Sequence, residues 1–499
     1  MYGRRITENG ERYNACVVVQ NRIRKVRKRD RSLVVFDQGR IVHAILRAAR
    51  SVGGFSFDHA PGVNDRLFSC GDDEHIAAFL SDVVVATLNR DPRHWIANFP
   101  PTIEEIQDTV IHVLRSFGFV TVADAYECWR WGKHWVRAGA ITMDEFVGNG
   151  YPIPLHEETL AWNREHGCDN VEGLNAIIRT GKLPDLVAAA TARYEQAVDG
   201  AAGKVLARAE GGNLRMIWIS GPSSSGKTTT TVKLLQRLER EGLQFLMLNL
   251  DDYFWPLVEH PTDWLNDRNF ETPEALDIQA INRHLRALLE GQTIEKPIYS
   301  FKEGRHVGTR PIRLRKGQFL LLDCLHGFYP PLTAGIEREA MFRLYIEAAN
   351  MLYEGDGTSE RLTQFTDVRL LRRMLRDAKH RNHPPLQTLL HWHYVRAGEL
   401  FSIIPLMGLA DHVVDGGMPF DLPVLKPFFL PDGIWPKPDE VAPYDTFLDA
   451  RLRYRRIASL LPQVAGLTLW EAEDHALIPG DHLVREFIGG STLKIPHNE

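Results

Sequence analysis

The octapeptide Gly221–Thr228, which reads GPSSSGKT, restricts the fold of this chain more than any other part of its sequence. It follows the apolar run Met216–Ser220 and precedes a segment with helical patterning, so it predicts a strand, a glycine-rich turn and a helix in succession. Backbone N–H groups of such a turn, together with the helix N-terminus, bind phosphate. Lys227 is placed to reach the β- and γ-phosphate oxygens, and the Thr228 hydroxyl is placed to hold Mg²⁺. The motif therefore predicts a nucleotide phosphate site.

Apolar runs alternate with helical patterns after residue 213, at 216–220, 245–250, 319–323, 342–346 and 412–414. This alternation predicts a parallel sheet flanked by helices, the α/β fold of P-loop NTPases. The first 150 residues show strand-like and then mainly helical patterning, with a well-started amphipathic helix at Pro101-Thr102. We therefore expect a mainly helical domain (1–150), a helical connector (151–212), the α/β core (213–430) and a C-terminal extension that packs on the core (431–499).

The overall composition is that of an ordinary globular protein. With 499 residues and a formal charge of −5, the chain is long enough for several domains and does not look like a dedicated nucleic-acid binder. No apolar stretch approaches the length of a membrane span, and the Arg4-Arg5 start lacks the apolar core of a signal peptide. Five scattered cysteines without a CxxC pair fit a reducing compartment. These features together predict a cytoplasmic protein.

Three carboxylates follow apolar runs at the edge of the expected sheet. Asp251 and Asp252 come directly after Leu250, and Asp323 ends a buried-strand pattern. The carboxyl edge of a parallel sheet is where α/β enzymes assemble their sites. Asp251 could orient an acceptor hydroxyl and take its proton, and Asp323 has the form of a carboxylate that helps to hold Mg²⁺. From residue type alone, a helix cap or a loop salt bridge explains the Asp251-Asp252 pair equally well.

Four arginines lie at positions i, i+3, i+4 and i+7 of a helical segment: Arg369, Arg372, Arg373 and Arg376. On one helix face, their guanidinium groups could clamp phosphates beneath a closing helical lid. The alternative is a solvated basic face with local partners such as Asp377. Four histidines that follow them lack the spacing and the acidic or cysteine partners of a zinc site, so we predict no metal there: His380, His383, His391 and His393.

The segment 214–428 resembles the uridine kinase and phosphoribulokinase family of P-loop kinases. The motifs that carry the resemblance are the phosphate loop, Leu250–Phe254, Asn269–Asp277, Pro297–Phe301 and the arginine spacing. The resemblance implies a core with a helical lid, ATP as donor and Mg²⁺ as cofactor. It implies catalytic roles for Asp251, Lys227, Arg369 and Arg373, and ATP contacts from Gly221, Ser223, Ser224, Ser225, Gly226, Lys227, Thr228, Thr229, Arg372 and Arg376. It implies acceptor contacts from Asp252, Tyr253, Glu271, Tyr299, Arg305 and Arg369, and Mg²⁺ ligands in Thr228 and Asp323.

The sequence departs from that family on the acceptor side. Uridine kinases carry Asp where Ser300 stands, a histidine that reads the base near the position of Gly304, and a shorter acid where Glu271 stands. The segments 394–399 and 483–491 look like the longer bacterial uridine-kinase-like proteins, whose acceptors are less uniform. The nucleotide side is therefore the better-matched half of the expected site.

The first domain resembles the ATP-cone domain of ribonucleotide reductases over residues 20–137. The resemblance rests on residues 26–30, 36–45, 101–108 and 122–126. It implies a regulatory site for adenine nucleotides in which Lys28, Arg29 and Arg40 contact phosphates. Arg31 stands where that family has Gly, and Arg40 where it has Lys. An RNA-binding arm or a solvated edge strand is the alternative for the basic run 22–31.

Two hypotheses of different classes follow from this sequence. The first is an ATP- and Mg²⁺-dependent kinase that phosphorylates a hydroxyl of a nucleoside or another sugar-bearing small molecule, regulated by adenine nucleotide at the first domain and assembled as a homo-oligomer. The second is a nucleotide-sensing regulator that binds ATP at both domains and phosphorylates nothing. A GTPase is disfavoured because the sequence contains no Asn-Lys-x-Asp motif.

Overall fold

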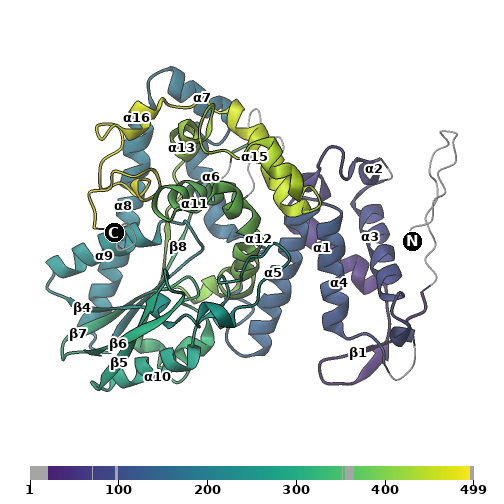
Figure 1. The fold of residues 1–499 in the computed structure, drawn as a ribbon, viewed down its shortest axis with the longest axis horizontal. Helices are drawn as coiled ribbons and strands as arrows, with labels where there is room; N and C mark the ends of the chain where they lie inside the picture. The colour runs from purple at the N-terminus through teal and green to yellow at the C-terminus, as the bar shows by residue number, and fades with distance from the viewer. Residues whose placement is uncertain (1–20, 70, 96–98, 351, 354–364, 495–499) are drawn as a thin grey trace. The chain divides into compact units, whose positions relative to one another are not determined.

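The computed structural model describes residues 21–69, 71–95, 99–350, 352–353 and 365–494 (Figure 1). The chain divides into two compact units, 1–126 and 127–499. The segment 151–212, expected as a connector, lies within the second unit. Among the described residues, no helix has both the length and the apolar character needed to cross a membrane.

The first unit is mainly helical, as its pattern predicts. A short antiparallel hairpin of β1 (Lys25–Arg27) and β2 (Leu33–Val35) precedes the helices. The expected helix start at Pro101-Thr102 is confirmed, because the Thr102 side chain and Glu105 form a capping box at the beginning of α4. The helices are α1 (Gly39–Ser51), α2 (Asp65–Phe68), α3 (Asp73–Leu88), α4 (Ile103–Ser116) and α5 (Val120–Arg137), the last of which extends beyond residue 126.

The second unit is built on a five-stranded sheet whose strands all run parallel, in the order β4-β7-β3-β8-β9 (Figure 1). The five strands fall on the five apolar runs of the sequence, so the predicted α/β fold is confirmed. Every residue of the central strand β3 is buried, with Ile217 and Ile219 in one hydrophobic cluster and Met216 and Trp218 in another. The bounds are β3 (Met216–Ser220), β4 (Gln244–Asn249), β7 (Gln318–Asp323), β8 (Met341–Glu347) and β9 (His412–Asp415).

Helices cover both faces of this sheet, and an antiparallel hairpin of β5 (Thr293–Ser300) and β6 (Arg305–Arg313) extends from it. Before and within the sheet, the helices are α6 (Ile153–Glu165), α7 (Val171–Arg179), α8 (Leu183–Glu210), α9 (Lys227–Arg240) and α10 (Ile278–Leu289). After β8 come α11 (Asp367–His380), α12 (Pro385–Ser402), α13 (Asp421–Phe429), α14 (Pro438–Val441), α15 (Leu448–Gln463), α16 (Leu469–Glu473) and α17 (Arg485–Ile488).

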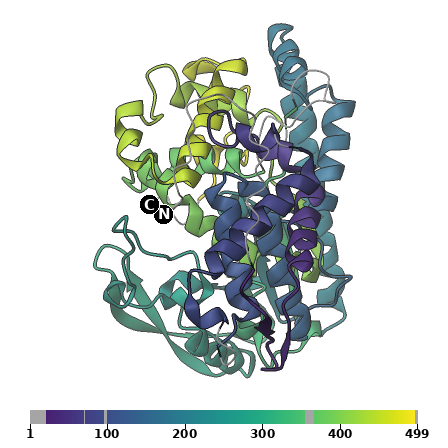
Figure 2. The ribbon, with the colours of Figure 1, turned by 90° about the vertical axis from the view of Figure 1, so that its right-hand side faces the viewer.

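The C-terminal helices share a core with the sheet. Leu483, Phe487 and Ile488 are buried in the same hydrophobic cluster as Ile217 and Ile219 of β3. Figure 2 shows these last helices, drawn in yellow, above the teal strands of the same unit. The C-terminal part of the chain is thus built into the sheet's packing, and it reaches the helix that follows the phosphate loop.

Candidate active site

The loop between β3 and α9 has the backbone that a phosphate site requires. Gly226, which precedes the first residue of α9, has a φ of 92°, and Ser224 has a φ of 61°. At Gly221 a Cβ atom would collide with the carbonyl oxygen of Ile346 in β8. Glycine is therefore needed at Gly221 for space and at Gly226 for backbone conformation.

The loop also carries buried hydroxyl groups that make no hydrogen bond to the described part of the protein. Within the described residues, the Oγ atoms of Ser224 and Ser225 are buried and have no hydrogen-bond partner. Gly226 offers no side chain to cap α9, whose N-terminus carries positive potential. Buried hydroxyls without partners are costly, and phosphate oxygens would accept from them. The loop therefore fits a phosphate-bearing ligand.

Lys227 begins α9 and turns back over the loop. Its Nζ donates to the carbonyl oxygens of Gly221 at 3.0 Å and of Pro222 at 3.1 Å. Burial lowers the pKa of Lys227, while the nearby carboxylates of Asp323 and Glu486 oppose that shift. The lysine is thus a partly desolvated cation held directly above the phosphate loop, where it can bind phosphate oxygens.

Two carboxylates meet at this edge of the sheet. Asp323 ends β7 and lies beside Ile219 of β3 and Asn249 of β4 in the strand register. Asp251 follows β4 in a short 3-10 helix, where its backbone N–H donates to the Asn249 side chain at 3.0 Å. Burial raises the pKa of Asp323 to about 6; Lys227 lowers it and Asp251 raises it further. Asp323 therefore interacts electrostatically with both Lys227 and Asp251.

The same carboxylates fit a magnesium ion. Burial is the main cause of the raised pKa of Asp323, and a bound cation would favour the charged form of this carboxylate. Mg²⁺ is usually held by one or two carboxylates together with substrate phosphates, rather than by a complete protein cage. In the described ranges, no group of three or more His, Cys, Asp or Glu side chains is arranged to hold a metal ion. Asp323 and the half-buried Thr228 are the residues that would hold the ion.

Asp252 and Tyr253 are turned to structural partners. The Asp252 carboxylate accepts from Lys296 and from the backbone N–H of Tyr299 at 3.1 Å, which anchors hairpin β5–β6. The Tyr253 hydroxyl lies 2.8 Å from Nδ1 of His284 in α10, and its ring is buried. The structure therefore brings neither side chain to the phosphate loop; both fix the elements around it.

Glu271 joins the acceptor-side segment to the phosphate loop. Its carboxylate accepts from Arg373 at 2.7 Å, and the same guanidinium group donates to Oγ of Ser223 at 3.0 Å. His391 lies between Asp267, at 2.6 Å, and Glu271, at 3.5 Å. Burial lowers the pKa of His391, but its hydrogen bonds to the two carboxylates outweigh burial and raise that pKa to about 9. From the sequence spacing we predicted no zinc site at this histidine. The spacing gave no indication that His391 would lie between Asp267 and Glu271.

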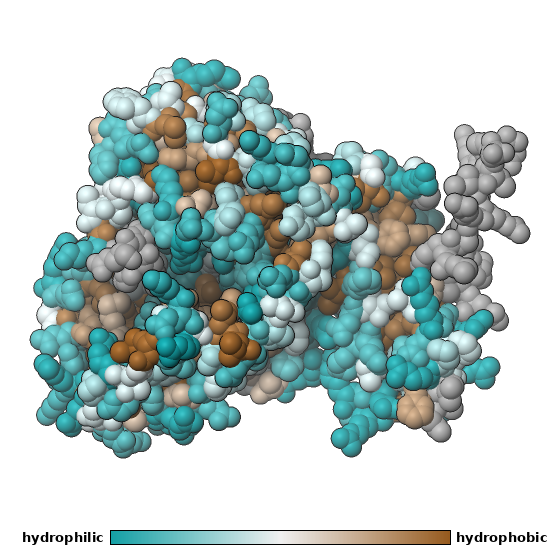
Figure 3. Space-filling view, viewed as in Figure 1, coloured by the Kyte–Doolittle hydropathy of each residue, from teal (hydrophilic) through white to brown (hydrophobic). Residues whose placement is uncertain are grey.

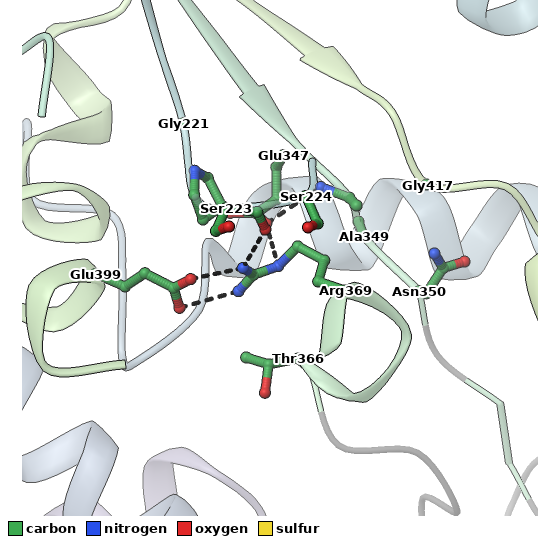
Figure 4. A network of polar contacts seen from close by, with 12 residues as sticks. Gly221, Ser223, Ser224, Glu347, Ala349, Asn350, Thr366, Arg369, Glu399 and Gly417 are labelled. Atoms are coloured by element: carbon green, nitrogen blue, oxygen red, sulfur yellow. Dashed lines mark hydrogen bonds and ion pairs between the residues drawn. The ribbon is translucent and has the colours of Figure 1, made fainter. Parts of the chain in front are cut away.

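Arg369 and Arg372 are both buried. Figure 4 shows Arg369 among Ser223, Glu347 and Glu399. Arg369 donates to the Ser223 carbonyl at 2.9 Å and to Glu399 at 2.6 and 3.0 Å, and it lies 3.4 Å from Glu347. These contacts leave its guanidinium group facing protein rather than ligand. A direct contact between Arg369 and phosphate or acceptor would require this network to break.

Arg372 is held in the same way on the next turn of α11. It donates to Asp421 at 2.7 to 3.0 Å and to the Gly416 carbonyl at 2.9 Å. A weaker contact, at 3.4 Å, reaches the Ser224 carbonyl. Its side chain is fully buried. The arginine stripe predicted as a lid is thus divided, and its first half braces the loop from below.

The later arginines of α11 face the carboxylate edge. Arg376 pairs with Asp377 at 3.0 Å. Arg381, which follows α11, was not singled out from the sequence; repulsion from Arg376 is the main cause of its lowered pKa, and Asp251 opposes that shift. Two guanidinium groups that crowd each other near Asp251 form a positive region suited to an anion. The sequence signal for this region is Arg381 itself, a fifth arginine at the end of the same helix, which the sequence analysis did not use.

A cavity of about 460 Å³ lies beside these segments. It is bounded by the loop after Asp251 and by the segment around Glu271, and its lining holds carboxylates and aromatic rings but no lysine or arginine. Hydrophobic side chains, brown in Figure 3, are exposed on this face of the second unit. The Tyr299 hydroxyl reaches the Trp255 carbonyl at the cavity wall, at 3.4 Å. Arg305 instead pairs with Glu303 at 2.5 Å and is well exposed.

In the first unit, Lys28 and Arg40 line an open cavity of about 690 Å³ at the N-terminus of α1. Arg40 is 80% exposed and lies 3.4 Å from Asp37. Arg29 points elsewhere, because it pairs with Glu104 of α4 at 2.5 Å. Two of the three expected phosphate contacts therefore share one cavity.

Comparison with known proteins finds two families in this chain. The description "ATP cone domain" matches residues 24–134, and "Phosphoribulokinase / Uridine kinase family" matches residues 216–351. A uridine kinase of Bacillus pumilus is 30% identical over 173 residues, which are 33% of this chain and 69% of that protein. A uridine kinase of Deinococcus deserti is 26% identical over 205 residues, 41% of this chain and 88% of that protein. A uridine-cytidine kinase B of Dictyostelium discoideum is 24% identical over 204 residues, 40% of this chain and 74% of that protein.

Proposed function

This chain belongs to the phosphoribulokinase and uridine kinase family, and from that premise we propose that it transfers the γ-phosphoryl group of ATP to a hydroxyl group of a small molecule. The acceptor we propose is a nucleoside or a related molecule that carries a sugar. The observation that carries this proposal is the meeting of Lys227, Asp251 and Asp323 at the mouth of the phosphate loop. In this proposal Lys227 is the cation that binds phosphate, Asp251 is the base and Asp323 is the carboxylate that binds the metal.

In this proposal the loop amides and Lys227 bind the β- and γ-phosphates. Asp251 accepts the proton of the acceptor hydroxyl as that oxygen attacks phosphorus. Arg376 and Arg381 offset the negative charge on the moving group. Mg²⁺, held by Asp323 and Thr228, would supply positive charge to the phosphate oxygens. Arg369 and Arg372 act through the loop that they brace, and we do not assign them a contact with substrate.

The acceptor side is proposed around Glu271 and Tyr299. Glu271 is fixed by Arg373. Burial raises the pKa of Glu271, but Arg373 and His391 outweigh burial and hold that pKa well below its ordinary value, so Glu271 is a charged acceptor for sugar hydroxyls. The neighbouring cavity is lined by Glu259, Asp263 and Glu274 without a cation, which disfavours an acceptor that already carries phosphate. A neutral or cationic polyhydroxy compound fits that lining.

The test is ADP production by the whole chain against a panel of nucleosides, sugars and sugar phosphates. We expect turnover to depend on a neutral sugar-bearing acceptor and to fall by about 10² or more in Asp251→Asn, because removal of a general base commonly costs 10²- to 10⁴-fold. ATP binding should survive this change. Glu290→Gln, which removes an exposed carboxylate at the end of α10, is the matched control. Unchanged turnover in Asp251→Asn would exclude Asp251 as the base.

We also propose that adenine nucleotide at the first unit regulates this activity. The supporting observation is the cavity at the start of α1, which Lys28 and Arg40 line. Coupling of this kind usually changes affinity by roughly 5- to 150-fold.

The alternative, a nucleotide sensor without an acceptor, has its own supporting observation. Arg369 and Arg372 are committed to buried carboxylates, so two of the four arginines expected over the phosphates are engaged elsewhere. A sensor would bind ATP yet release no additional ADP with any acceptor of the panel. Acceptor-dependent ADP release would exclude it.

A further inference from the structure

A carboxylate from the C-terminal end of the chain reaches the first turn of the phosphate-loop helix. Oε2 of Glu486 accepts from the backbone N–H of Thr229 at 3.1 Å and from its hydroxyl at 2.8 Å. Glu486 is only 4% exposed. These two donors lie 257 residues before it in the sequence, so the phosphate-loop motif assigns no such partner.

The rest of α17 is fixed around this carboxylate by contacts of its own. Arg485 donates to the carbonyl oxygens of Ile478 and Asp474. The ring of Phe487 lies 4.8 Å from the guanidinium carbon of Arg372, and the Ile488 carbonyl accepts from Lys379 at 2.6 Å. Glu486 is therefore presented to Thr229 by a packed segment that also contacts α11.

The donors that Glu486 occupies belong to the anion site itself. Gly226 packs against Leu483, so the turn that holds phosphate and the segment that holds Glu486 are in contact. Glu486 also acts on the charges of Lys227 and Asp323. First-turn N–H groups of such a helix normally bind phosphate, and an anion at that position repels a second one.

We propose that Glu486 competes with the nucleotide for the Thr229 donors, and that its carboxylate must leave them before the phosphate next to the nucleoside can bind. This inference rests on the phosphate site of the proposed function. The loop proper, with its unpartnered Ser224 and Ser225 hydroxyls, stays open to the terminal phosphates. Glu486 thus lowers the affinity for nucleotide. Binding of the nucleotide displaces Glu486 and therefore acts on α17, which contacts α11.

The test is calorimetric binding of a non-hydrolysable ATP analogue, of ADP and of inorganic pyrophosphate to the whole chain. In Glu486→Gln the side chain keeps its shape and loses its charge, so we expect the analogue and ADP to bind about tenfold more tightly, close to 1.4 kcal/mol. Pyrophosphate, which needs only the loop, should gain much less. The control is Glu473→Gln, an exposed carboxylate on α16.

The outcomes separate this inference from the proposed function. Equal or weaker binding of the ATP analogue by Glu486→Gln, while the wild type binds it, overturns the competition and leaves the kinase proposal intact. Absence of analogue binding in the wild type overturns both. If Glu486→Gln does not fold, hydrogen exchange in the wild type decides: analogue binding should speed exchange in residues 483–489, and slower or unchanged exchange overturns the inference.

Discussion

Replacing Arg372 by Met decides between a ligand-binding and a bracing role for the buried half of the arginine stripe. The substitution removes the guanidinium group that donates to Asp421, to Gly416 and to Ser224. Asp421 then keeps its bonds from Asn350 and from the Met418 backbone, but it loses its charge partner in a fully buried position. A buried charge without its partner is the expected cause of instability.

The magnitude follows from the burial of both partners. Removing one member of a buried ion pair costs about 3–5 kcal/mol. The second unit spans 127–499, and at roughly 2.1 cal/mol/K per residue its unfolding entropy is about 0.8 kcal/mol/K. Arg372→Met should therefore lower the Tm of this unit by about 4–6 °C. The double variant Arg372→Met with Asp421→Leu removes both charges and should recover most of that loss.

The assay is differential scanning calorimetry of the whole chain, followed through the transition of the larger unit. Arg305→Met is the matched control, since Arg305 is well exposed and its pair with Glu303 is worth about 1 kcal/mol or less. That control should shift Tm by no more than about 1 °C. A Tm unchanged by Arg372→Met, together with lost ATP affinity, would refute the bracing role and restore the contact predicted from the sequence.

Three further predictions test other parts of the site. Lys227→Met should weaken binding of a non-hydrolysable ATP analogue at least about tenfold, measured by calorimetry, because a charge-assisted bond to phosphate is lost. His391 has a folded pKa of about 9, above its ordinary 6.5, so its stabilising contribution is complete below pH 6.5 and is lost as pH rises through 9. The Tm of the wild type should therefore fall more steeply over that window than the Tm of His391→Gln; parallel curves would contradict this. Lys28→Ala with Arg40→Ala should abolish any effect of ATP or dATP on kinase activity at the first unit while leaving basal turnover intact, and an unchanged response would exclude that cavity.

The sheet could be predicted from the sequence because its signals are local. Each strand is a short apolar run bounded by polar residues, and the helix after the central strand begins directly at the phosphate loop. The start of α4 could be predicted for the same reason, since Thr102 and Glu105 lie three residues apart and cap the same turn. The positions of helices and strands can be predicted because they depend on residues that are close together in the sequence.

The partners of charged side chains could not be predicted in this way. Helical spacing placed Arg369 and Arg372 on one face of α11, as the sequence suggested. It could not show that Glu399 and Asp421, 30 and 49 residues later, would occupy their guanidinium groups. The contact between Glu486 and Thr229, which are 257 residues apart, could not be predicted from the sequence for the same reason. The charged residues on one helix face can be assigned to ligand or protein partners only when the elements packed against that face are known.

The bracing of the loop also restricts how the site can close. Arg369 and Arg373 both contact Ser223, and Arg372 reaches the carbonyl of the next residue, so the first turns of α11 are tied to the phosphate loop. Swinging the whole helix as a lid would break two buried ion pairs, each costing several kcal/mol. Arg376 and Arg381 lie beyond these ties, at the end of α11 near Asp251. Closure over the transferring phosphoryl group is therefore expected from movement of these later side chains, with α11 and the loop acting as one rigid support.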